Sequence, residues 1–258
     1  MENLKYLKFE EQNGIAIITL NYPKVNGLIP ELVTELRTSV HHCRYTDRIR
    51  CVVITAAGGF FSAGADVQTL LAAQDQIEVQ VRKMAEVFHE ALSIMMRMEK
   101  PVITAVNGFA AGAGFGLAIA GDIVIAAETA KFCLSYPNAG LSPDGASTYL
   151  LPRLIGLRRT IELAFTNRTL SAQESLEWNM VTQVVPDEQL LNTALGLAQK
   201  LAQGPTDAYG YIKKLMLLTY SNSLEEQTDF EKEGIAHQMS SYNGQEGIKA
   251  FMENATKF

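Results

Sequence analysis

The stretch KPVITAVNGFAAGAG, residues 100–114, decides the class of fold. Its β-branched run at 102–106 is typical of a short buried strand. A glycine-rich turn follows at 108–114, and the apolar run at 115–120 is expected to form a buried helix. A further short apolar run at 123–126 predicts the next strand. Strands that alternate with helices in this way indicate an α/β protein.

The same alternation continues toward the N-terminus. Short β-branched runs at 15–20 and 51–55 predict two more strands. Apolar residues recur every three or four positions over 30–44 and again over 68–98, which predicts two helices. We expect the second to be one long helix that carries His89.

Beyond Pro152 the pattern becomes helical. Apolar spacing predicts helices over 154–165, 172–178, 187–203, 207–220 and most of 224–258. We therefore expect an α/β core over residues 1–195 and a C-terminal helical region over residues 196–258. Helices of that region need a surface to pack on, so we interpret them as a lid over the core, an oligomer contact, or both.

Composition narrows the class of protein. The chain has 258 residues, of which 47% are apolar and 19% charged, and this excludes disordered and fibrous classes. The formal net charge is −6 and there is no long run of lysine and arginine, which argues against nucleic acid as the main partner.

The cysteines and the N-terminus bear on location. Cys43, Cys51 and Cys133 match no zinc or redox spacing, so we expect buried thiols. The N-terminus has no apolar leader, and no apolar stretch approaches the ~20 residues of a membrane span. We expect a soluble, cytoplasmic protein that does not engage a membrane.

Two segments of small residues carry backbone N–H groups suited to binding an anion. FSAGAD at 61–66 and GFAAGAGFG at 108–116 each follow a strand and open a helix, where free amides can bind an oxyanion. The second segment does not match the G-x-G-x-x-G dinucleotide fingerprint, and no acidic residue follows at a strand end about twenty positions on, so a dinucleotide-binding fold is rejected. Two N–H donors from separate loops can instead converge on one carbonyl oxygen.

Asp144 and His89 are the candidates for proton transfer. Asp144 lies in the turn-rich loop 136–148 among small and apolar neighbours, where it either forms an ordinary Pro-Asp-Gly turn or is held ready to move protons. His89 lies on the expected long helix, where a lone histidine is also typical of a surface or packing residue. No metal site is expected, because no metal-ligand spacing links it to His41, His42 or His237.

Together these motifs resemble those of the crotonase (enoyl-CoA hydratase/isomerase) superfamily, in the family's order and over nearly the whole chain. The matching segments are FSAGAD (61–66), KPVITAVNGFAAGAG (100–114), AGDI (120–123), AKF (130–132), LPRLIG (151–156), TLSAQE (169–174) and QEGIKAF (245–251). The resemblance implies a crotonase-like spiral of repeated strand-strand-helix units with C-terminal helices. It also implies a homotrimer or a dimer of trimers.

The resemblance further implies an acyl-CoA thioester as substrate. The oxyanion-hole amides would be those of Ala65 and Ala113, which hold the thioester oxygen and stabilise an enolate. The positions expected along the coenzyme A path are Lys24, Val25, Ala63, Asp66, Val67, Gly112 and Gly140. Coenzyme A is part of the substrate, and no separate cofactor is expected.

Departures from the family pattern bear on the reaction. Hydratases of the family use two glutamates, and the matching positions here are Gly116 and Tyr136. Asp144 instead matches members that place an acid in this loop, enoyl-CoA isomerases among them. One carboxylate suits a 1,3-proton shift, with Tyr136 as a hydrogen-bond partner, whereas water addition needs a second group. An enoyl-CoA isomerase is therefore the first expectation.

Two alternatives stay open. The 4-chlorobenzoyl-CoA dehalogenases, a branch of the same superfamily, use an aspartate in this loop as nucleophile and a histidine on the long helix to activate water. Asp144 and His89 match those positions, and Tyr136 stands where that branch has a tryptophan. Loss of both glutamates is also what a non-catalytic acyl-CoA-binding module would show, although the paired amides with Asp144 and His89 argue against it.

Overall fold

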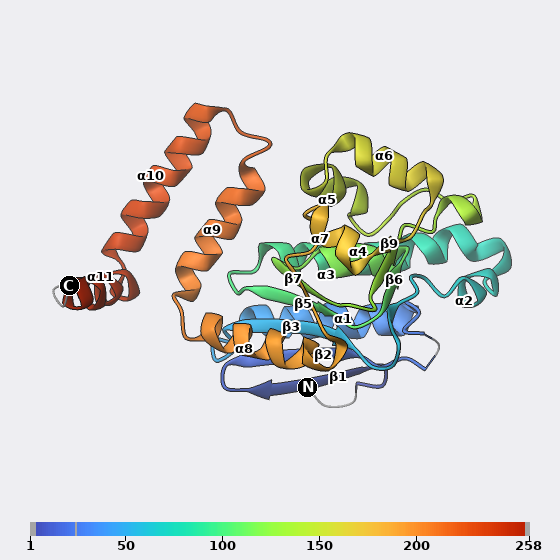
Figure 1. Cartoon of the computed structure of the whole chain (residues 1–258), viewed down its shortest axis with the longest axis horizontal. Coiled ribbons are helices and arrows are strands. Elements are labelled where there is room, and N and C mark those ends of the chain that lie inside the picture. The colour runs from blue at the N-terminus through green and yellow to red at the C-terminus, as the bar shows by residue number, and fades with distance from the viewer. Residues whose placement is uncertain (1–3, 24, 256–258) are drawn as a thin grey trace.

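The computed structural model describes residues 4–23 and 25–255, and the strands of these residues form two sheets (Figure 1). The larger sheet has the order β1-β2-β3-β5-β7-β10. Its first two strands form an antiparallel hairpin, and the remaining pairs are parallel. The strands are β1 (Leu7–Gln12), β2 (Ile15–Leu20), β3 (Cys51–Ala56), β5 (Val102–Val106), β7 (Ile123–Ala127) and β10 (Gln183–Val185). The strands expected at 15–20, 51–55, 102–106 and 123–126 are thus confirmed.

The smaller sheet consists of short strands that the apolar pattern did not predict. Its order is β4-β6-β8-β9, and β4, β6 and β8 each come shortly after a strand of the larger sheet. This repetition, a long strand and then a short one before the next helix, is the expected strand-strand-helix unit. The strands are β4 (Phe60–Ser62), β6 (Phe109–Ala111), β8 (Lys131–Cys133) and β9 (Leu170–Ser171).

Helices cover the sheets on both sides. Helix α8 (Leu190–Ala202) packs across β2, β3, β5 and β7, and α1 (Pro30–Tyr45) lies against β1 and β2 and packs on α3 (Ile77–Arg97). Helix α4 (Ala113–Ile119) is buried along its whole length, because it is built of glycine, alanine and large apolar residues. The three cysteines are buried, as expected, and burial raises the pKa of the Cys43 and Cys51 thiols to about 12.

Two helices differ from the sequence-based expectation. The helix expected over 68–98 is broken into α2 (Val67–Leu71), a 3-10 turn (Gln74–Gln76) and α3. None of the residues of α2 is fully buried, and only Leu70 packs against the core. Gln74 adopts a positive φ of 48°, which interrupts the helical backbone before α3 begins. His89 does lie on α3.

The segment expected as a helix over 154–165 is also divided. It falls into α5 (Ser147–Leu154), which contains Pro152, and α6 (Leu157–Thr166). Gly156, at a φ of 80°, separates the two helices. Helix α7 (Ala172–Glu177) follows as expected, and its first turn has a capping box made by Ser171 and Glu174.

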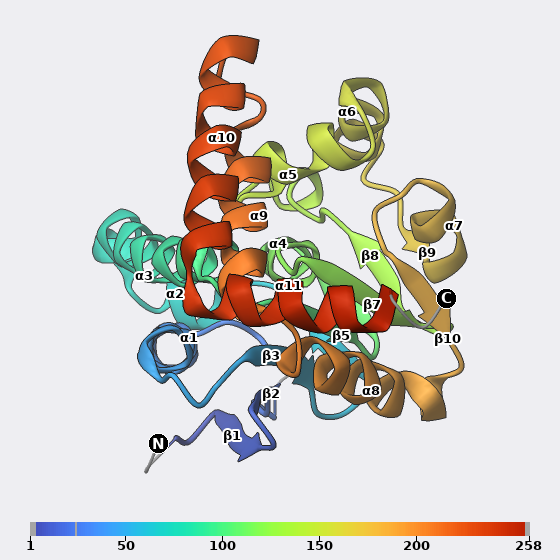
Figure 2. The same ribbon diagram turned by 90° about the vertical axis from the view of Figure 1, so that its left-hand side faces the viewer.

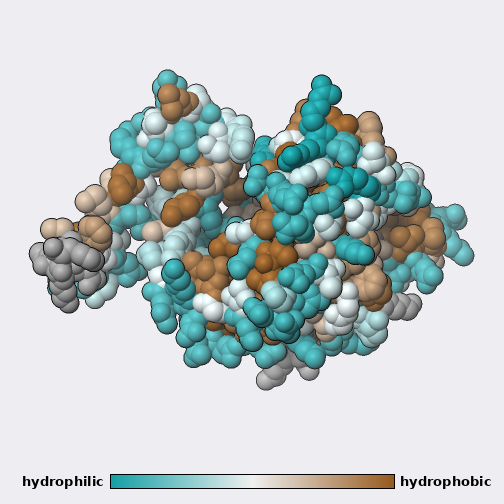
Figure 3. Space-filling view, viewed as in Figure 1, coloured by the Kyte–Doolittle hydropathy of each residue, from teal (hydrophilic) through white to brown (hydrophobic). Residues whose placement is uncertain are grey.

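The C-terminal helices form an arm that extends from the core (Figures 1 and 2). They are α9 (Thr206–Leu218), α10 (Leu224–Ser240) and α11 (Tyr242–Ala255). The surface is hollowed between arm and core, and apolar side chains are exposed on the arm (Figure 3); they include Ile212, Met216, Tyr220, Leu224, Phe230, Ile235, Met239, Ile248 and Phe251. The domain division at residue 195 stays a prediction, and α8 runs across it. No helix among the described residues is long and apolar enough to cross a membrane.

The base of the arm is tied to the core by two cationic side chains. The Arg50 guanidinium donates to the carbonyls of Ala202 and Gly204 at 2.6 and 2.7 Å. The Lys213 ammonium, on α9, lies 2.7 Å from the Asp122 carboxylate and also donates to two carbonyls of the core. The Lys213 side chain is 9% exposed, so its charge is kept inside the protein by pairing with Asp122, whose side chain is 28% exposed.

Candidate active site

The first segment of small residues forms a loop between β4 and α2. It lies beside Leu28, whose N–H donates to the Gly64 carbonyl at 2.7 Å and whose carbonyl accepts from Asp66 N–H at 2.9 Å. The N–H of Ala65, between these two bonds, has no acceptor among the described residues. The Asp66 side chain caps α2 by accepting from the Thr69 N–H at 3.1 Å.

The second segment leads from β6 into α4. Gly112 adopts a φ of 53°, a left-handed conformation that suits glycine, and Ala113 is the first residue of the helix. The N–H of Ala113 also lacks an acceptor within the described part of the chain.

The two segments touch. A Cβ atom on Gly64 would lie 2.7 Å from the Ala111 carbonyl oxygen and 3.2 Å from the Ala113 nitrogen. The absence of a side chain at Gly64 therefore lets the loop carrying Ala65 reach the amide of Ala113. This is the neighbourhood in which two donors can share one carbonyl oxygen.

Contacts between glycines hold the Asp144 loop next to the segment that carries Ala113. A Cβ atom on Gly116 would lie 2.1 Å from the Gly145 carbonyl oxygen, and one on Gly145 would lie 3.3 Å from the Ala113 carbonyl oxygen. The loop that carries Asp144 is thus packed against the first turn of α4. Asp144 Oδ1 accepts from its neighbouring Gly145 N–H at 2.5 Å and is hydrogen-bonded to Nε2 of His89. The structure therefore brings Asp144, His89 and Ala113 together.

Tyr136 lies next to Gly112. Its ring Cζ would be 4.0 Å from a Cβ on Gly112, and its hydroxyl is buried with no hydrogen-bond partner among the described residues. Burial, and secondly the negative charge of Asp144, raise the pKa of Tyr136. The phenol therefore stays protonated and is a neutral group beside the two amides.

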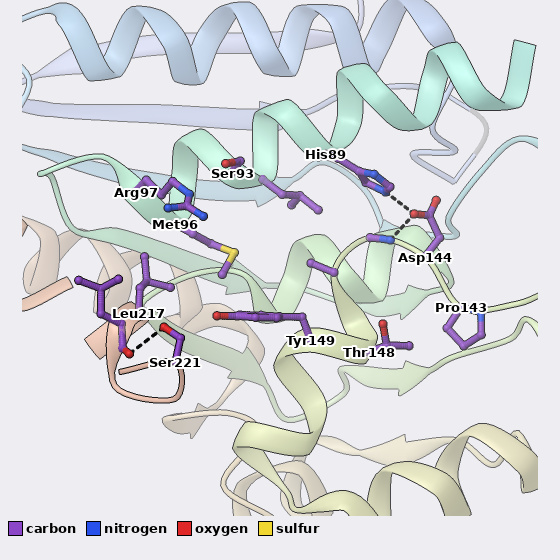
Figure 4. A pocket seen from close by; sticks show the side chains of 14 residues that line it. His89, Ser93, Met96, Arg97, Pro143, Asp144, Thr148, Tyr149, Leu217 and Ser221 are labelled. Atoms are coloured by element: carbon purple, nitrogen blue, oxygen red, sulfur yellow. Dashed lines mark hydrogen bonds and ion pairs between the residues drawn. The ribbon is translucent and has the colours of Figure 1, made fainter. Parts of the chain in front are cut away.

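A cavity of about 550 Å³ opens beside Asp144, between α3, α5 and the end of α9 (Figure 4). His89 and Asp144 lie at one end, and Arg97, Leu217 and Ser221 lie at the other (Figure 4). Asp144 is the only carboxylate among its described lining residues. Ala65, Ala113 and Tyr136 do not line it.

Sequence reasoning missed most of this lining. On α3, Ser93, Met96 and Arg97 follow His89 at spacings of four, seven and eight residues and so share its face, a signal that the sequence contains. Tyr149 and Leu217 come from α5 and α9, and no local pattern links those segments to α3.

A second cavity, of about 340 Å³, lies at the end of β2 and β3. Its lining residues are Asn21, Tyr22, Pro23, Val25, Asn26, Ala57, Gly58, Gly59 and Phe60. Of the expected coenzyme A positions, Val25 lines this cavity, and Lys24 lies outside the described residues. Ala63 donates its N–H to the Val25 carbonyl at 3.1 Å and so adjoins it. Val67 and Gly140 are exposed and line neither cavity.

Comparison with known proteins agrees with this architecture. The family model described as enoyl-CoA hydratase/isomerase matches residues 10–258, and the chain belongs to that family, whose members process acyl-CoA thioesters.

Individual relatives differ in the reaction that their names give. The chain is 37% identical over 251 residues to the 1,2-epoxyphenylacetyl-CoA isomerase of Escherichia coli, with 96% of each chain covered. It is 30% identical over 232 residues to a 4-chlorobenzoyl coenzyme A dehalogenase of Arthrobacter, covering 89% of this chain and 84% of the relative. A crystal structure of an enoyl-CoA hydratase from Polaromonas has a TM-score of 0.91 at 35% identity, covering 96% of this chain and 97% of that one.

Proposed function

We propose that this protein is an acyl-CoA isomerase that moves a carbon–carbon double bond relative to the thioester. The observation that carries the proposal is the packing of Gly116 against Gly145. Hydratases have a glutamate at the position of Gly116. In this protein the backbone of the Asp144 loop occupies the space where a side chain of residue 116 would begin. The second glutamate position holds the neutral Tyr136, so Asp144 is the carboxylate left beside the paired amides.

The arrangement supports a proton shift within one substrate. The Ala65 and Ala113 amides would hold the thioester oxygen, and Asp144 would take a proton from C2 of a 3-enoyl thioester. The electrons of the C–H bond then pass into a dienolate whose charge rests on the thioester oxygen. Asp144 returns the proton at C4, which leaves the double bond between C2 and C3. The adenine nucleotide of coenzyme A would lie along the cavity that Val25 lines.

The hydrogen bond between His89 and Asp144 favours a second candidate. A carboxylate that attacks an aromatic ring and a histidine that activates water would both be present for dehalogenase-like hydrolysis of an aryl thioester. The Arthrobacter relative supports this candidate. The isomerase of E. coli supports an isomerase that acts on a coenzyme A thioester, and its named substrate carries an epoxide rather than a 3-enoyl chain.

Separate incubation with 3-enoyl-CoA, 2-enoyl-CoA and 4-chlorobenzoyl-CoA tests the proposal. We expect conversion of the first thioester without hydration of the second. Release of chloride from the third thioester, with no change in the first, would contradict the isomerase and support the dehalogenase-like hydrolase. Tight binding of all three without turnover would indicate a non-catalytic acyl-CoA-binding module.

We also propose that the protein is a homotrimer or a dimer of trimers. The exposed apolar side chains of α9, α10 and α11 support this, because an extended arm with so much apolar surface is typical of an interface. Sedimentation equilibrium at micromolar concentration should give three or six times the mass of 28.3 kDa, and a monomer would contradict the proposal.

A further inference from the structure

Ser62 lies between the second cavity and the loop that carries Ala65. Its side chain is fully buried. The hydroxyl donates to the Asn26 carbonyl at 2.8 Å and accepts from the Gly64 N–H at 3.2 Å. One side chain thus links the segment lining the cavity to the residue next to Ala65.

Asn26 holds that cavity together. Its amide nitrogen donates to the carbonyls of Ala57 and Phe60 at 2.9 and 2.8 Å, and its amide oxygen accepts from the Tyr22 N–H at 2.9 Å. All four residues line the cavity. The wall therefore behaves as one hydrogen-bonded unit, and the Ser62 hydroxyl connects this unit to the loop.

The backbone of this wall is strained. Val25 and Asn26 have φ angles of 50° and 51°, in the left-handed region, which is unfavourable for a β-branched residue such as valine. Such conformations persist only where surrounding contacts hold them, and they gather at ligand-binding segments. Val25 is 43% exposed and faces the cavity, so a ligand there would contact the strained segment directly.

Ser62 also touches the second amide-bearing segment. A Cβ atom on Gly114 would lie 2.5 Å from the Ser62 Cβ and 2.6 Å from its hydroxyl oxygen. Ser62 is therefore packed directly against the first turn of α4, with no space between them. A movement of Ser62 would therefore change the position of Gly64 relative to Ala113, and with it the alignment of the two donors.

We propose that Ser62 is a positioning residue that couples occupancy of the second cavity to the alignment of the Ala65 N–H. The inference rests on the proposed function, which assigns the adenine nucleotide of coenzyme A to that cavity. Binding of a part of the substrate that does not react would then raise the rate of the chemical step as well as the affinity.

The test compares thioesters with and without the nucleotide. The 3-enoyl thioesters of coenzyme A and of pantetheine are given to the natural protein, to Ser62→Ala and to Ser175→Ala. Ser175 is a matched control, because it is equally buried and its hydroxyl donates to a backbone carbonyl at 2.7 Å, on α7. The melting temperature of each variant checks that it is folded.

We expect the natural protein to have a kcat about tenfold higher with the coenzyme A thioester than with the pantetheine thioester. Ser62→Ala should lose about tenfold in kcat with the coenzyme A thioester and change less than about twofold with pantetheine, since one hydrogen bond is removed. Ser175→Ala should keep the ratio of the natural protein. Equal kcat values for the two thioesters in the natural protein, or equal losses for both in Ser62→Ala, would overturn the coupling.

A binding measurement separates failure of this inference from failure of the proposed function. Cinnamoyl thioesters have no proton to shift, and their absorption moves to longer wavelength when the carbonyl is polarised by hydrogen bonds. We expect a larger shift for cinnamoyl-CoA than for cinnamoyl-pantetheine in the natural protein, and equal shifts in Ser62→Ala. If this difference is seen while 3-enoyl thioesters are not isomerised, the function is wrong and the coupling stands. Equal shifts in the natural protein would overturn the coupling itself.

Discussion

Nε2 of His89, on α3, and Oδ1 of Asp144, in the loop before α5, share a hydrogen bond although 55 residues separate them in the sequence. Packing of Phe88 on this loop brings them together, since a Cβ on Gly145 would lie 3.1 Å from the Phe88 ring. Oδ1 accepts from the Gly145 N–H as well. Oδ2 has no donor among the described residues, so it is the oxygen available to a substrate.

Replacement of Asp144 tests the proton-transfer role. Asp144→Ala should abolish turnover of 3-enoyl-CoA while the dissociation constant for the thioester changes by less than about tenfold, because the two amides and the cavity lined by Val25 are untouched. Stopped-flow turnover and isothermal titration measure the two effects. Loss of binding together with turnover would show that Asp144 has a structural role.

Replacement of His89 separates the two candidate reactions. His89→Ala should lower isomerase kcat by less than about tenfold, because the Asp144 carboxylate keeps its bond to the Gly145 N–H. In a dehalogenase-like enzyme the same change should stop release of the product after the aryl intermediate forms, since no group activates water. Mass spectrometry of the protein after incubation with 4-chlorobenzoyl-CoA would detect that intermediate.

Gly116→Glu tests whether the first hydratase glutamate can be introduced at this position. The new side chain meets the Gly145 backbone at its first carbon, so we expect a loss of more than about 2 kcal/mol in the free energy of unfolding and no hydration of 2-enoyl-CoA. Gly196→Glu is the control, because nothing lies within 4 Å of a Cβ at that helical position. A stable Gly116→Glu variant with hydratase activity would contradict the structural argument.

The ion pair at the base of the arm predicts a pH dependence. Lys213→Met leaves the partly exposed Asp122 carboxylate without its cation, which should lower the free energy of unfolding by about 1.5–3 kcal/mol near neutral pH. Burial raises the pKa of Asp122 already in the natural protein. A carboxyl pKa that is raised in the folded state gives stability below the ordinary pKa and loses it as the pH rises through the folded value. Toward about pH 4 the unpaired Asp122 becomes protonated, so the difference in free energy of unfolding between the variant and the natural protein should become smaller.

Urea unfolding of Lys213→Met and of the natural protein at both pH values measures this deficit. Lys214→Met is the matched control, because Lys214 is exposed and has no ion pair among the described residues. It should unfold like the natural protein at either pH. A deficit in Lys213→Met that is equal at both values would show that Asp122 is not the group responsible.

The sequence predicted the long parallel strands because each is a β-branched run buried on both faces. It did not predict β4, β6 and β8, because three residues are too few to show a period. It also joined α2 to α3, since spacing cannot reveal that Val67 and Leu71 of α2 remain exposed and that only Leu70 packs on the core. At the site, the sequence predicted Ala65, Ala113 and Asp144, because each lies in a motif of consecutive residues. Met96, Tyr149 and Leu217 required the structure, because only tertiary packing places them around one cavity.

The close packing of Gly116 on Gly145 limits which substitutions this site can accept. Where two backbones meet with no space for a first side-chain carbon, a residue larger than glycine fits at position 116 only if the loop bearing Asp144 moves away. New specificity is therefore easier to engineer by altering the residues around Asp144 than by adding a second acid on α4.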